Sequence, residues 1–551
     1  MKRIIIAISC LMLLSSLETN SVVGFGASAC ARRSSIAVGE WWGGFEFNNN
    51  LTVLKIRFSE EGGELKGRIA QALPPWGPTG ALDQVSLRSL NLHFESPVNN
   101  GSPIIFEGQL ESSGELITGS VQSGSLRGTF QLLHTVILED TIFDQYVGEY
   151  QIGHGSYVSI SRPPPGEPSA GIQYTVHNLS NPNQRSGNLF PISEGAFVAG
   201  PGRWVPHPVE INAAFFKNEK GEVVLKWKPI DSAEVVGNKV KPHLWDEEEV
   251  KFSNGNITLA GTLSLPLTKG PHPAVILISG SDGGLRGRGL PQFFAQHGIA
   301  ALAYDKRGFG SSTGTILGAT INDMAGDAAA GVRYLQKRAD IAPTKVGVWS
   351  ISQGGWMAPV VAITTRNVAF IILHAGPAVS PRLQGRMELI SNLAGLSQQE
   401  LGEAIAYHNL YMDAMNSDEA YDKVQAAYER LRQRGVRWVW RPAPKEQLRA
   451  QWTAPNVDFE PVPVLEKVKC PVLAFFGGKD GLVPPEGNVS IMEAALKKAG
   501  NKDFTIKVLP GVNHNFQLAG MGSWGFQSSG KTPPGYYDVM VDWLKQRINP
   551  H

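Results

Sequence analysis

The chain has 551 residues, of which 42% are hydrophobic and 18% are charged. This length exceeds what one hydrophobic core holds, so we expect two or three domains. Lysine and arginine number 50 against 49 aspartates and glutamates, which excludes the broad basic surface of a nucleic-acid-binding protein and favours a small neutral substrate.

The first segment has the pattern of an export signal. Lys2 and Arg3 precede an apolar run over residues 4–14, which is shorter than the roughly 20 residues that span a bilayer. We therefore expect a cleaved signal peptide over residues 1–29, export to the periplasm or the medium, and no transmembrane span. Cys30 follows several small residues, so lipoprotein anchoring at Cys30 is an alternative.

Two β-rich units are expected next, over residues 38–138 and 146–235. Leu54, Ile56 and Phe58 alternate with polar residues, and this period of two is typical of antiparallel strands with one buried face. The tetrapeptide VGEW at position 38 recurs as VGEY at position 147, which favours two successive units, although a four-residue match is also compatible with chance.

An acidic run at residues 246–249 separates this half from a region of different texture. From there to residue 549, apolar strand-like runs alternate with helical patterns, which predicts a mostly parallel sheet covered on both faces. The stretch 381–463 interrupts this alternation with helical patterns alone, and we expect it to form a helical lid insertion.

The sharpest motif surrounds Ser352, where an apolar strand runs into a glycine-rich turn and then a helix. Such a turn lifts a serine hydroxyl clear of the sheet and exposes it as a nucleophile. The motif requires small residues two positions before and after the serine. Gly354 meets this requirement, whereas Ser350 stands where glycine is usual. Helix capping by Ser352 is the alternative interpretation.

A serine nucleophile requires a base and an acid to orient it. Asp480 and His514 each follow an apolar strand, and the carboxyl ends of parallel strands are where catalytic groups gather. We therefore predict Asp480 as the acid and His514 as the base. His374, at the end of another strand, is the second candidate base, but no suitable acid follows it in the expected order.

Acyl transfer also requires donors for the developing oxyanion. The backbone N–H of Gln353, directly after the nucleophile, is one candidate, and Ser281 in the loop after the first central strand is the other. A plain glycine-rich turn is the alternative for that loop.

Two further side chains are candidate substrate contacts. Arg307 follows a strand near the expected mouth of the site and can bind an anionic group, although a local ion pair is the commoner use of such an arginine. Trp356, just after the proposed nucleophile, is the second candidate.

These motifs resemble those of bacterial α/β-hydrolases of the esterase, dienelactone-hydrolase-like and acyl-thioesterase-like kinds. The matching positions are residues 279–284, 304–310, 346–355, Asp480 and His514. The resemblance implies an α/β-hydrolase fold over 246–549, and the N-terminal half resembles the β-rich, partly lipocalin-like extensions of exported relatives.

The sequence thus predicts a serine esterase that acts through an acyl-enzyme intermediate. A prolyl-oligopeptidase-like peptidase is the first alternative, although about 190 β-rich residues without a blade repeat are short for a propeller. A binding module with a degenerate hydrolase domain is the second. Only three cysteines occur and no nucleotide fingerprint has the required context, so we expect neither a cofactor nor a metal.

Overall fold

The structure is a computed structural model. It describes residues 35–47, 50–73, 78–97, 103–124, 126–153, 156–163, 170–178, 185–201, 204–240, 245–281, 284, 286–287, 289–393, 396–436, 438–518, 532–533 and 535–548. The signal peptide predicted over residues 1–29 and the alternative anchor Cys30 lie outside these residues.

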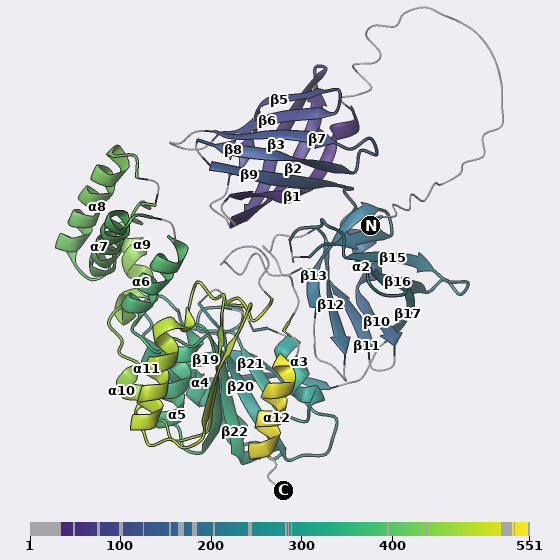
Figure 1. The fold of residues 1–551 in the computed structure, drawn as a ribbon. Coiled ribbons are helices and arrows are strands. Elements are labelled where there is room, and N and C mark those ends of the chain that lie inside the picture. The colour runs from purple at the N-terminus through teal and green to yellow at the C-terminus, as the bar shows by residue number, and fades with distance from the viewer. Residues whose placement is uncertain are drawn as a thin grey trace, which may run out of the picture.

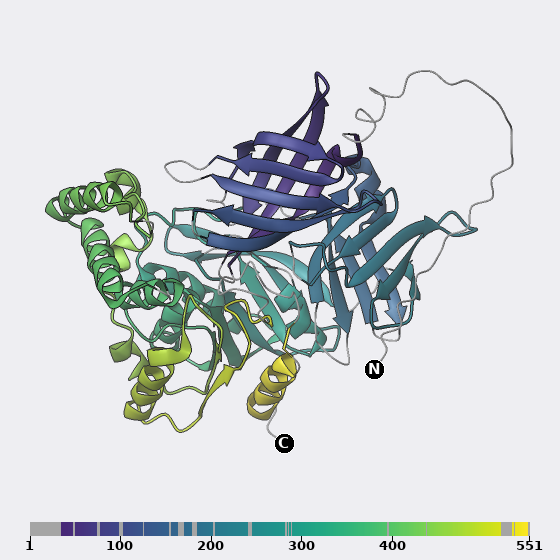
Figure 2. The ribbon, with the colours of Figure 1, turned by 45° about the horizontal axis from the view of Figure 1, so that its top comes forward.

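The first unit is a nine-stranded antiparallel sheet (Figures 1 and 2). Its strands follow the order β4-β3-β2-β1-β9-β8-β7-β6-β5. Their bounds are β1 (Gly39–Phe47), β2 (Asn50–Glu61), β3 (Glu64–Leu73), β4 (Gly80–Ala81), β5 (Asp83–Arg88), β6 (Asn91–Ser96), β7 (Ile104–Leu110), β8 (Leu116–Ser123) and β9 (Leu126–Thr135). The short 3-10 helix η1 (Ser35–Ala37) precedes it. Stacked and edge-on phenylalanines, among them Phe94 and Phe106 at 4.4 Å, fill its core.

The second unit is a closed antiparallel barrel in which each strand pairs with the next and β17 pairs back with β10. Helix α2 (Asp140–Tyr146) leads into it. Its strands are β10 (Gly148–Gly153), β11 (Ser156–Ser161), β12 (Ile172–Asn178), β13 (Arg185–Ser193), β14 (Ala196–Ala199), β15 (Ile211–Lys217), β16 (Val223–Pro229) and β17 (Val235–Val240). Buried aromatic side chains such as Tyr150, Tyr174 and Trp227 form its core.

The two β units share a small apolar cluster. Trp42 of β1 contacts Phe190 of β13 with ring centroids 5.4 Å apart.

The strand pairings of both units confirm the prediction of an antiparallel β-rich region. The more specific lipocalin-like description is corrected, because the region consists of two packed units, and the closed one is filled by its own aromatic side chains.

The third unit is an eight-stranded sheet with the order β18-β19-β21-β20-β22-β23-β24-β25. The first two pairs in this order are antiparallel and the remaining five are parallel. The strands are β18 (Asp246–Asn254), β19 (Ile257–Leu265), β20 (His272–Ile278), β21 (Ala300–Tyr304), β22 (Ile341–Ile351), β23 (Val368–His374), β24 (Val472–Gly477) and β25 (Phe504–Leu509). The acidic run at 246–249, expected as a solvated boundary, forms the start of the edge strand β18 and is exposed.

Helices cover both faces of this sheet, as the alternation of strands and helices predicts. The helices α3 (Gly289–Gln296) and α12 (Tyr536–Ile548) lie on one face of the sheet. The ring centroids of Phe293 in α3 and Tyr537 in α12 are 4.6 Å apart. The helices α4 (Ile321–Gln336), α5 (Gly354–Thr364), α10 (Val462–Leu465) and α11 (Pro485–Lys498) follow one another on the other side (Figure 1). Sheet and helices enclose the largest hydrophobic cluster of the described residues.

The insertion between β23 and α10 is helical where it is described. It contains α6 (Pro381–Asn392), α7 (Gln398–Ala414), α8 (Asp418–Gln433), α9 (Lys445–Ala450) and the 3-10 helix η2 (Ala454–Asn456). The helices α7 and α8 pack around their own apolar cluster. Figure 1 shows these two helices to one side of the sheet. No helix in the described residues combines the length and apolar character that a membrane span requires.

Candidate active site

Ser352 occupies the sharp turn between β22 and α5. Its φ angle is 54°, in the left-handed region that side chains other than glycine rarely adopt. The backbone N–H of Ser352 donates to the carbonyl of His374 at 2.9 Å, and its own carbonyl accepts the N–H of Gly355 at 2.7 Å. These bonds hold a strained conformation that is typical of a nucleophile turn.

The two glycines after Ser352 are required by close backbone approach. A Cβ on Gly355 would lie 2.3 Å from the Cα of Gly376, and one on Gly354 would lie 2.8 Å from the carbonyl oxygen of Ile278. Ser350, which replaces the usual glycine, is fully buried and its hydroxyl donates to Ile372 at 3.4 Å. The structure therefore accommodates the one departure from the motif by a hydrogen bond to the neighbouring strand.

Asp480 and His514 are in direct contact. The Nδ1 atom of His514 lies 2.8 Å from Oδ2 of Asp480, and both side chains are almost fully buried. The other carboxylate oxygen of Asp480 accepts the backbone N–H groups of Leu482 at 2.9 Å and Val483 at 2.8 Å. Because an ionised carboxylate only accepts, Nδ1 of His514 carries a proton in this pair.

All three candidate residues follow parallel strands at the same edge of the third sheet. Ser352 follows β22, Asp480 follows β24 and His514 follows β25. Three residues widely separated in the sequence thus project from one side of a single sheet, as the sequence analysis predicts for a nucleophile, an acid and a base. Their catalytic roles stay predictions until they are tested by substitution.

The second candidate base, His374, is enclosed by aromatic rings. Trp349 donates its indole N–H to Nε2 of His374 at 2.9 Å, and the hydroxyl of Tyr536 contacts Nδ1. Tryptophan is only a donor, so Nε2 is unprotonated and Nδ1 carries the hydrogen. Burial lowers the pKa of His374 to about 3. These contacts indicate a structural role for His374.

The two predicted oxyanion donors come from different loops. Gln353 is buried at the start of α5, and its side-chain oxygen accepts a hydrogen bond from Lys306 at 2.9 Å. Ser281 lies in the exposed turn just after β20. Lys306 also donates to the carbonyl of Gly280, beside Ser281. The sequence analysis placed Lys306 in a matching motif but assigned it no role.

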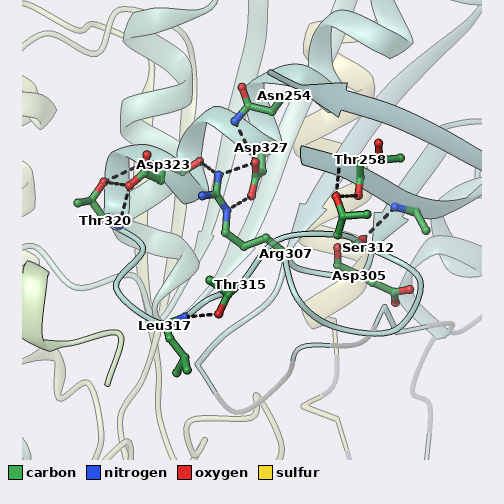
Figure 3. Close-up of polar contacts among 12 residues, drawn as sticks. Asn254, Thr258, Asp305, Arg307, Ser312, Thr315, Leu317, Thr320, Asp323 and Asp327 are labelled. Atoms are coloured by element: carbon green, nitrogen blue, oxygen red, sulfur yellow. Dashed lines mark hydrogen bonds and ion pairs between the residues drawn. The ribbon is translucent and has the colours of Figure 1, made fainter. Parts of the chain in front are cut away.

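Arg307 points toward Asp323 and Asp327 of α4 (Figure 3). Its guanidinium forms two hydrogen bonds with Asp327, at 2.7 and 2.8 Å, and donates to the carbonyl of Asp323 at 2.9 Å. Asp327 accepts a further bond from Asn254 at 2.9 Å. This is the local ion pair that the sequence left open as the alternative, so we do not place Arg307 in the substrate site.

Trp356 is also committed elsewhere. Its side chain is 4% exposed, and its indole N–H donates to the carbonyl of Val379 at 2.8 Å. The ring lies 5.9 Å from that of Trp452. The contacts describe a core side chain that joins α5 to the end of the insertion, and they leave the predicted substrate contact without support.

Glu388 of α6 is a residue that the sequence analysis did not find. Burial is the main reason that its pKa is raised to about 7; the charge of Asp480 raises it further, whereas His514 acts in the opposite direction. Helix α6 is held over this region because Gln384 donates to the carbonyl of Leu482, in the turn after Asp480. Only the spacing of Gln384 and Glu388 on one helical face signals this position in the sequence.

A cavity of about 200 Å³ lies against the strand that ends at the candidate nucleophile. It is lined by Ser186, Leu290, Trp349, Ile351, His374, Asn515, Phe516, Gln517, Thr532, Tyr536 and Tyr537. Ser186 belongs to the β-barrel, so the second unit contributes to the wall. The described residues contain no group of three or more metal-ligating side chains arranged around one point.

A family model and two curated relatives match part of the chain. Residues 271–518 match the family model described as serine aminopeptidase, S33. Two Escherichia coli relatives, each described as an uncharacterized 31.7 kDa protein in the traX-finO intergenic region, are 24% identical over 267 residues, which cover 46% of this chain and 86% of each relative.

Solved structures with similarity to this chain include three hydrolases. The α/β hydrolase GrgF from Penicillium sp. sh18 is 18% identical and covers 55% of this chain and 99% of its own, with a TM-score of 0.36. The Pyrococcus furiosus esterase Pf2001 is 17% identical, with coverages of 57% and 98% and a TM-score of 0.35. Est1E from Butyrivibrio proteoclasticus, solved with ferulic acid bound, is 17% identical, with coverages of 54% and 96% and a TM-score of 0.33.

The C-terminal unit has the α/β-hydrolase fold. The family match lies within that unit, from the start of β20 to the turn after His514. The strand order, with one antiparallel edge and a nucleophile turn after β22, gives the same assignment from the chain's own topology.

Proposed function

We propose that this chain is a serine hydrolase that cleaves carboxylic esters of small molecules through an acyl-enzyme intermediate. The observation that carries the proposal is the buried hydrogen bond between His514 and Asp480, on the sheet edge where Ser352 sits in a strained turn. The strained turn costs stability by itself, and its combination with an oriented histidine is what nucleophilic catalysis by serine requires.

In the proposed reaction, Nε2 of His514 takes the proton of Ser352 as the serine oxygen attacks the ester carbonyl. The tetrahedral intermediate collapses, the bond to the alcohol oxygen breaks, and His514 returns the proton to that leaving oxygen. Water then attacks the acyl-enzyme by the same route and releases the acid. Asp480 fixes the orientation of His514 and stabilises the imidazolium in both halves.

The backbone N–H groups of Gln353 and Ser281 are the proposed donors to the oxyanion. Gln353 directly follows the nucleophile, and Ser281 follows β20, which lies next to β22 in the sheet. Donors fixed before the reaction stabilise the charge that develops in the transition state without reorganisation. No cofactor enters this proposal.

A small substrate group is consistent with the cavity beside Ile351. Its volume is about 200 Å³, and cavities of about 150 Å³ hold a benzene ring. Its lining combines apolar and aromatic side chains with uncharged polar ones, which favours an uncharged group over an ionised one. We therefore expect uncharged esters with short or aromatic groups to be better substrates than long-chain or anionic esters.

The direct test is hydrolysis of p-nitrophenyl esters by the protein and by Ser352→Ala. We expect measurable turnover by the unmodified protein and the loss of nearly all turnover in a variant that remains folded by circular dichroism. A fluorophosphonate probe is expected to label Ser352, as located by mass spectrometry. Full activity in folded Ser352→Ala, or labelling at another residue, would refute the assignment.

A serine aminopeptidase is the second candidate, because the matching family model is described in those words. Peptide hydrolysis would use the same nucleophile, base and acid, with an amine as leaving group. Aminoacyl and prolyl p-nitroanilides assayed beside the esters separate the candidates. A kcat/KM for an aminoacyl amide above that for every ester would replace the esterase proposal.

We also propose that the protein is exported by means of residues 1–29. The support is the basic and apolar pattern of that segment alone. Expression of the full chain followed by N-terminal analysis of the periplasmic and membrane fractions tests it. A mature N-terminus near residue 30 is expected, and acylated Cys30 would identify the lipoprotein alternative.

A further inference from the structure

Lys306 is a buried cation at the carboxyl end of β21. Lys306 is 7% exposed and lies in a loop beside the candidate nucleophile turn. Its ammonium donates to the carbonyl of Gly280 and, at 2.9 Å, to the side-chain oxygen of Gln353. A buried ammonium is costly unless its N–H groups are hydrogen-bonded, and these two acceptors satisfy two of the three.

The two acceptors belong to the two loops that carry the proposed oxyanion donors. Gly280 directly precedes Ser281, and Gln353 directly follows Ser352. The loops are separated by about 70 residues in sequence and follow the neighbouring strands β20 and β22. Lys306 contacts both of them, and it comes from β21, the strand on the other side of β20.

Backbone N–H groups attach the loop after β20 to the end of β21, at the part of this loop that lies beyond Gly280 and Ser281 in sequence. The backbone N–H of Arg286 donates to Asp305 at 3.0 Å, and the backbone N–H of Lys306 donates to the carbonyl of Gly284 at 2.8 Å. The side chain of Lys306 is thus not required to attach this loop to β21. Its hydrogen bonds act at the near end, where the loop faces the nucleophile turn.

We propose that Lys306 is a positioning residue that holds the two loops of the oxyanion donors at a fixed separation. The inference rests on the proposed serine hydrolase function. Lys306 acts through the carbonyl of Gly280, whose peptide group carries the N–H of Ser281, and through the side chain of Gln353. Donors held in place before the substrate arrives favour the transition state over the bound substrate, since the negative charge is present only in the former.

The test is Lys306→Met, which keeps the length of the side chain and removes its charge and N–H donors. We expect kcat for a p-nitrophenyl ester to fall by about 10²-fold, the loss caused by removal of one oxyanion donor, with KM nearly unchanged. The pH profile is expected to keep its shape, because His514 and Asp480 are untouched.

Fluorophosphonate labelling supplies the readout that a merely structural role would not change. The phosphonyl oxygen occupies the oxyanion site, so we expect a slower rate constant of labelling while the fraction of labelled protein stays near complete. Lys306→Arg keeps the charge and the donors, and we expect it to recover part of the rate. A lower labelled fraction with an unchanged rate constant would indicate a loss of folded protein and would overturn the inference.

Gln353→Met supplies a second route should Lys306→Met not fold. It removes the side-chain acceptor and keeps the backbone N–H, so we expect the same pattern with a smaller decrease in kcat. In the double variant, we expect the decrease in kcat to be smaller than the two single decreases combined. The reason is that both substitutions break the same hydrogen bond, between Lys306 and Gln353. Additive losses, or a wild-type labelling rate in Gln353→Met, would overturn the inference.

Lys469→Met is the matched control. The ammonium of Lys469 also donates to a backbone carbonyl, that of Ala499. Lys469 precedes β24 and Asp480 follows it, so the two residues lie at opposite ends of this strand. We expect kcat to be unchanged. Failure of the proposed function has a different signature, because the unmodified protein would then show neither ester turnover nor labelling of Ser352.

Discussion

The Nδ1 atom of His514 lies 2.8 Å from Oδ2 of Asp480, while Oδ1 of the same carboxylate accepts two backbone N–H groups of its own turn. The carboxylate is thus fixed in position before it meets the imidazole. Because the turn supplies those two donors, the ring of His514 is oriented by the backbone around Asp480 as well as by the side chain.

Asp480→Asn should keep the turn and lose the reaction. The asparagine oxygen can still accept from Leu482 and Val483, but its amide group then faces Nδ1 of His514 and favours the wrong tautomer. We expect kcat to fall by about 10³- to 10⁴-fold with little change in melting temperature. Steady-state kinetics and a thermal melt measure both, and a decrease below tenfold would contradict the orienting role.

The sequence predicts the parts of this site that depend on local pattern. Ser352, Asp480 and His514 each stand in the loop after an apolar strand, and the order of parallel strands brings such positions to one edge. The departure at Ser350 was visible as well, but its hydrogen bond to Ile372 depends on β23 lying beside β22.

The partners of long side chains lie beyond such patterns. Lys306 and Arg307 are adjacent in sequence, yet one turns to Gln353 and the other to Asp327 on α4. Their directions depend on which strand and helix pack on each side of the loop. Closure of the barrel is a similar case, since the pairing of β10 with β17 joins segments about 90 residues apart that carry no local signal.

Gly355→Ala should destabilise the nucleophile turn. Its Cβ would lie 2.3 Å from the Cα of Gly376, and neither backbone can move without disturbing β22 or β23. We expect a loss of about 1–3 kcal/mol or more in the free energy of unfolding. Gly402→Ala, in α7 where the added Cβ meets nothing within 4 Å, is the control and should stabilise by about 0.5–1 kcal/mol. Equal stabilities of the two variants would argue against this crowding.

Arg307→Met should reduce stability and leave the reaction intact. The side chains of Arg307 and Asp327 are 11% and 3% exposed, so removal of one partner leaves a buried charge and costs about 3–5 kcal/mol. Denaturant unfolding measures this loss, and kcat/KM of the folded enzyme should be unchanged for neutral esters. A selective rise in KM for anionic esters would instead restore Arg307 as a substrate contact.

The pair formed by Lys423 and Glu419 is the control for that charge effect. These side chains are 62% and 78% exposed on α8, where solvent screens the interaction. Lys423→Met is therefore expected to leave the free energy of unfolding nearly unchanged. A loss as large as that of Arg307→Met would mean that burial does not set the strength of these pairs.

Glu388→Gln should raise stability at alkaline pH. The pKa of Glu388 is raised from 4.5 to about 7 in the folded protein, so between these values the folded state holds a proton that the unfolded chain has released. Its favourable contribution is complete below pH 4.5 and is lost as pH rises through 7. Glutamine keeps the shape without ionising, so the stability of the variant relative to the unmodified protein should increase from pH 4.5 to pH 8.

Denaturant midpoints of both proteins at the two pH values measure this change, and Glu400→Gln supplies a control that should show little of it. Glu400 caps α7, and its hydrogen bonds with Ser397 lower its pKa. Its contribution is therefore present above about pH 4.5 and is lost only as pH falls further through the lowered pKa, so the relative stability of Glu400→Gln should change little from pH 4.5 to pH 8. Parallel trends in the two variants would mean that burial beside Asp480 does not govern the ionisation of Glu388.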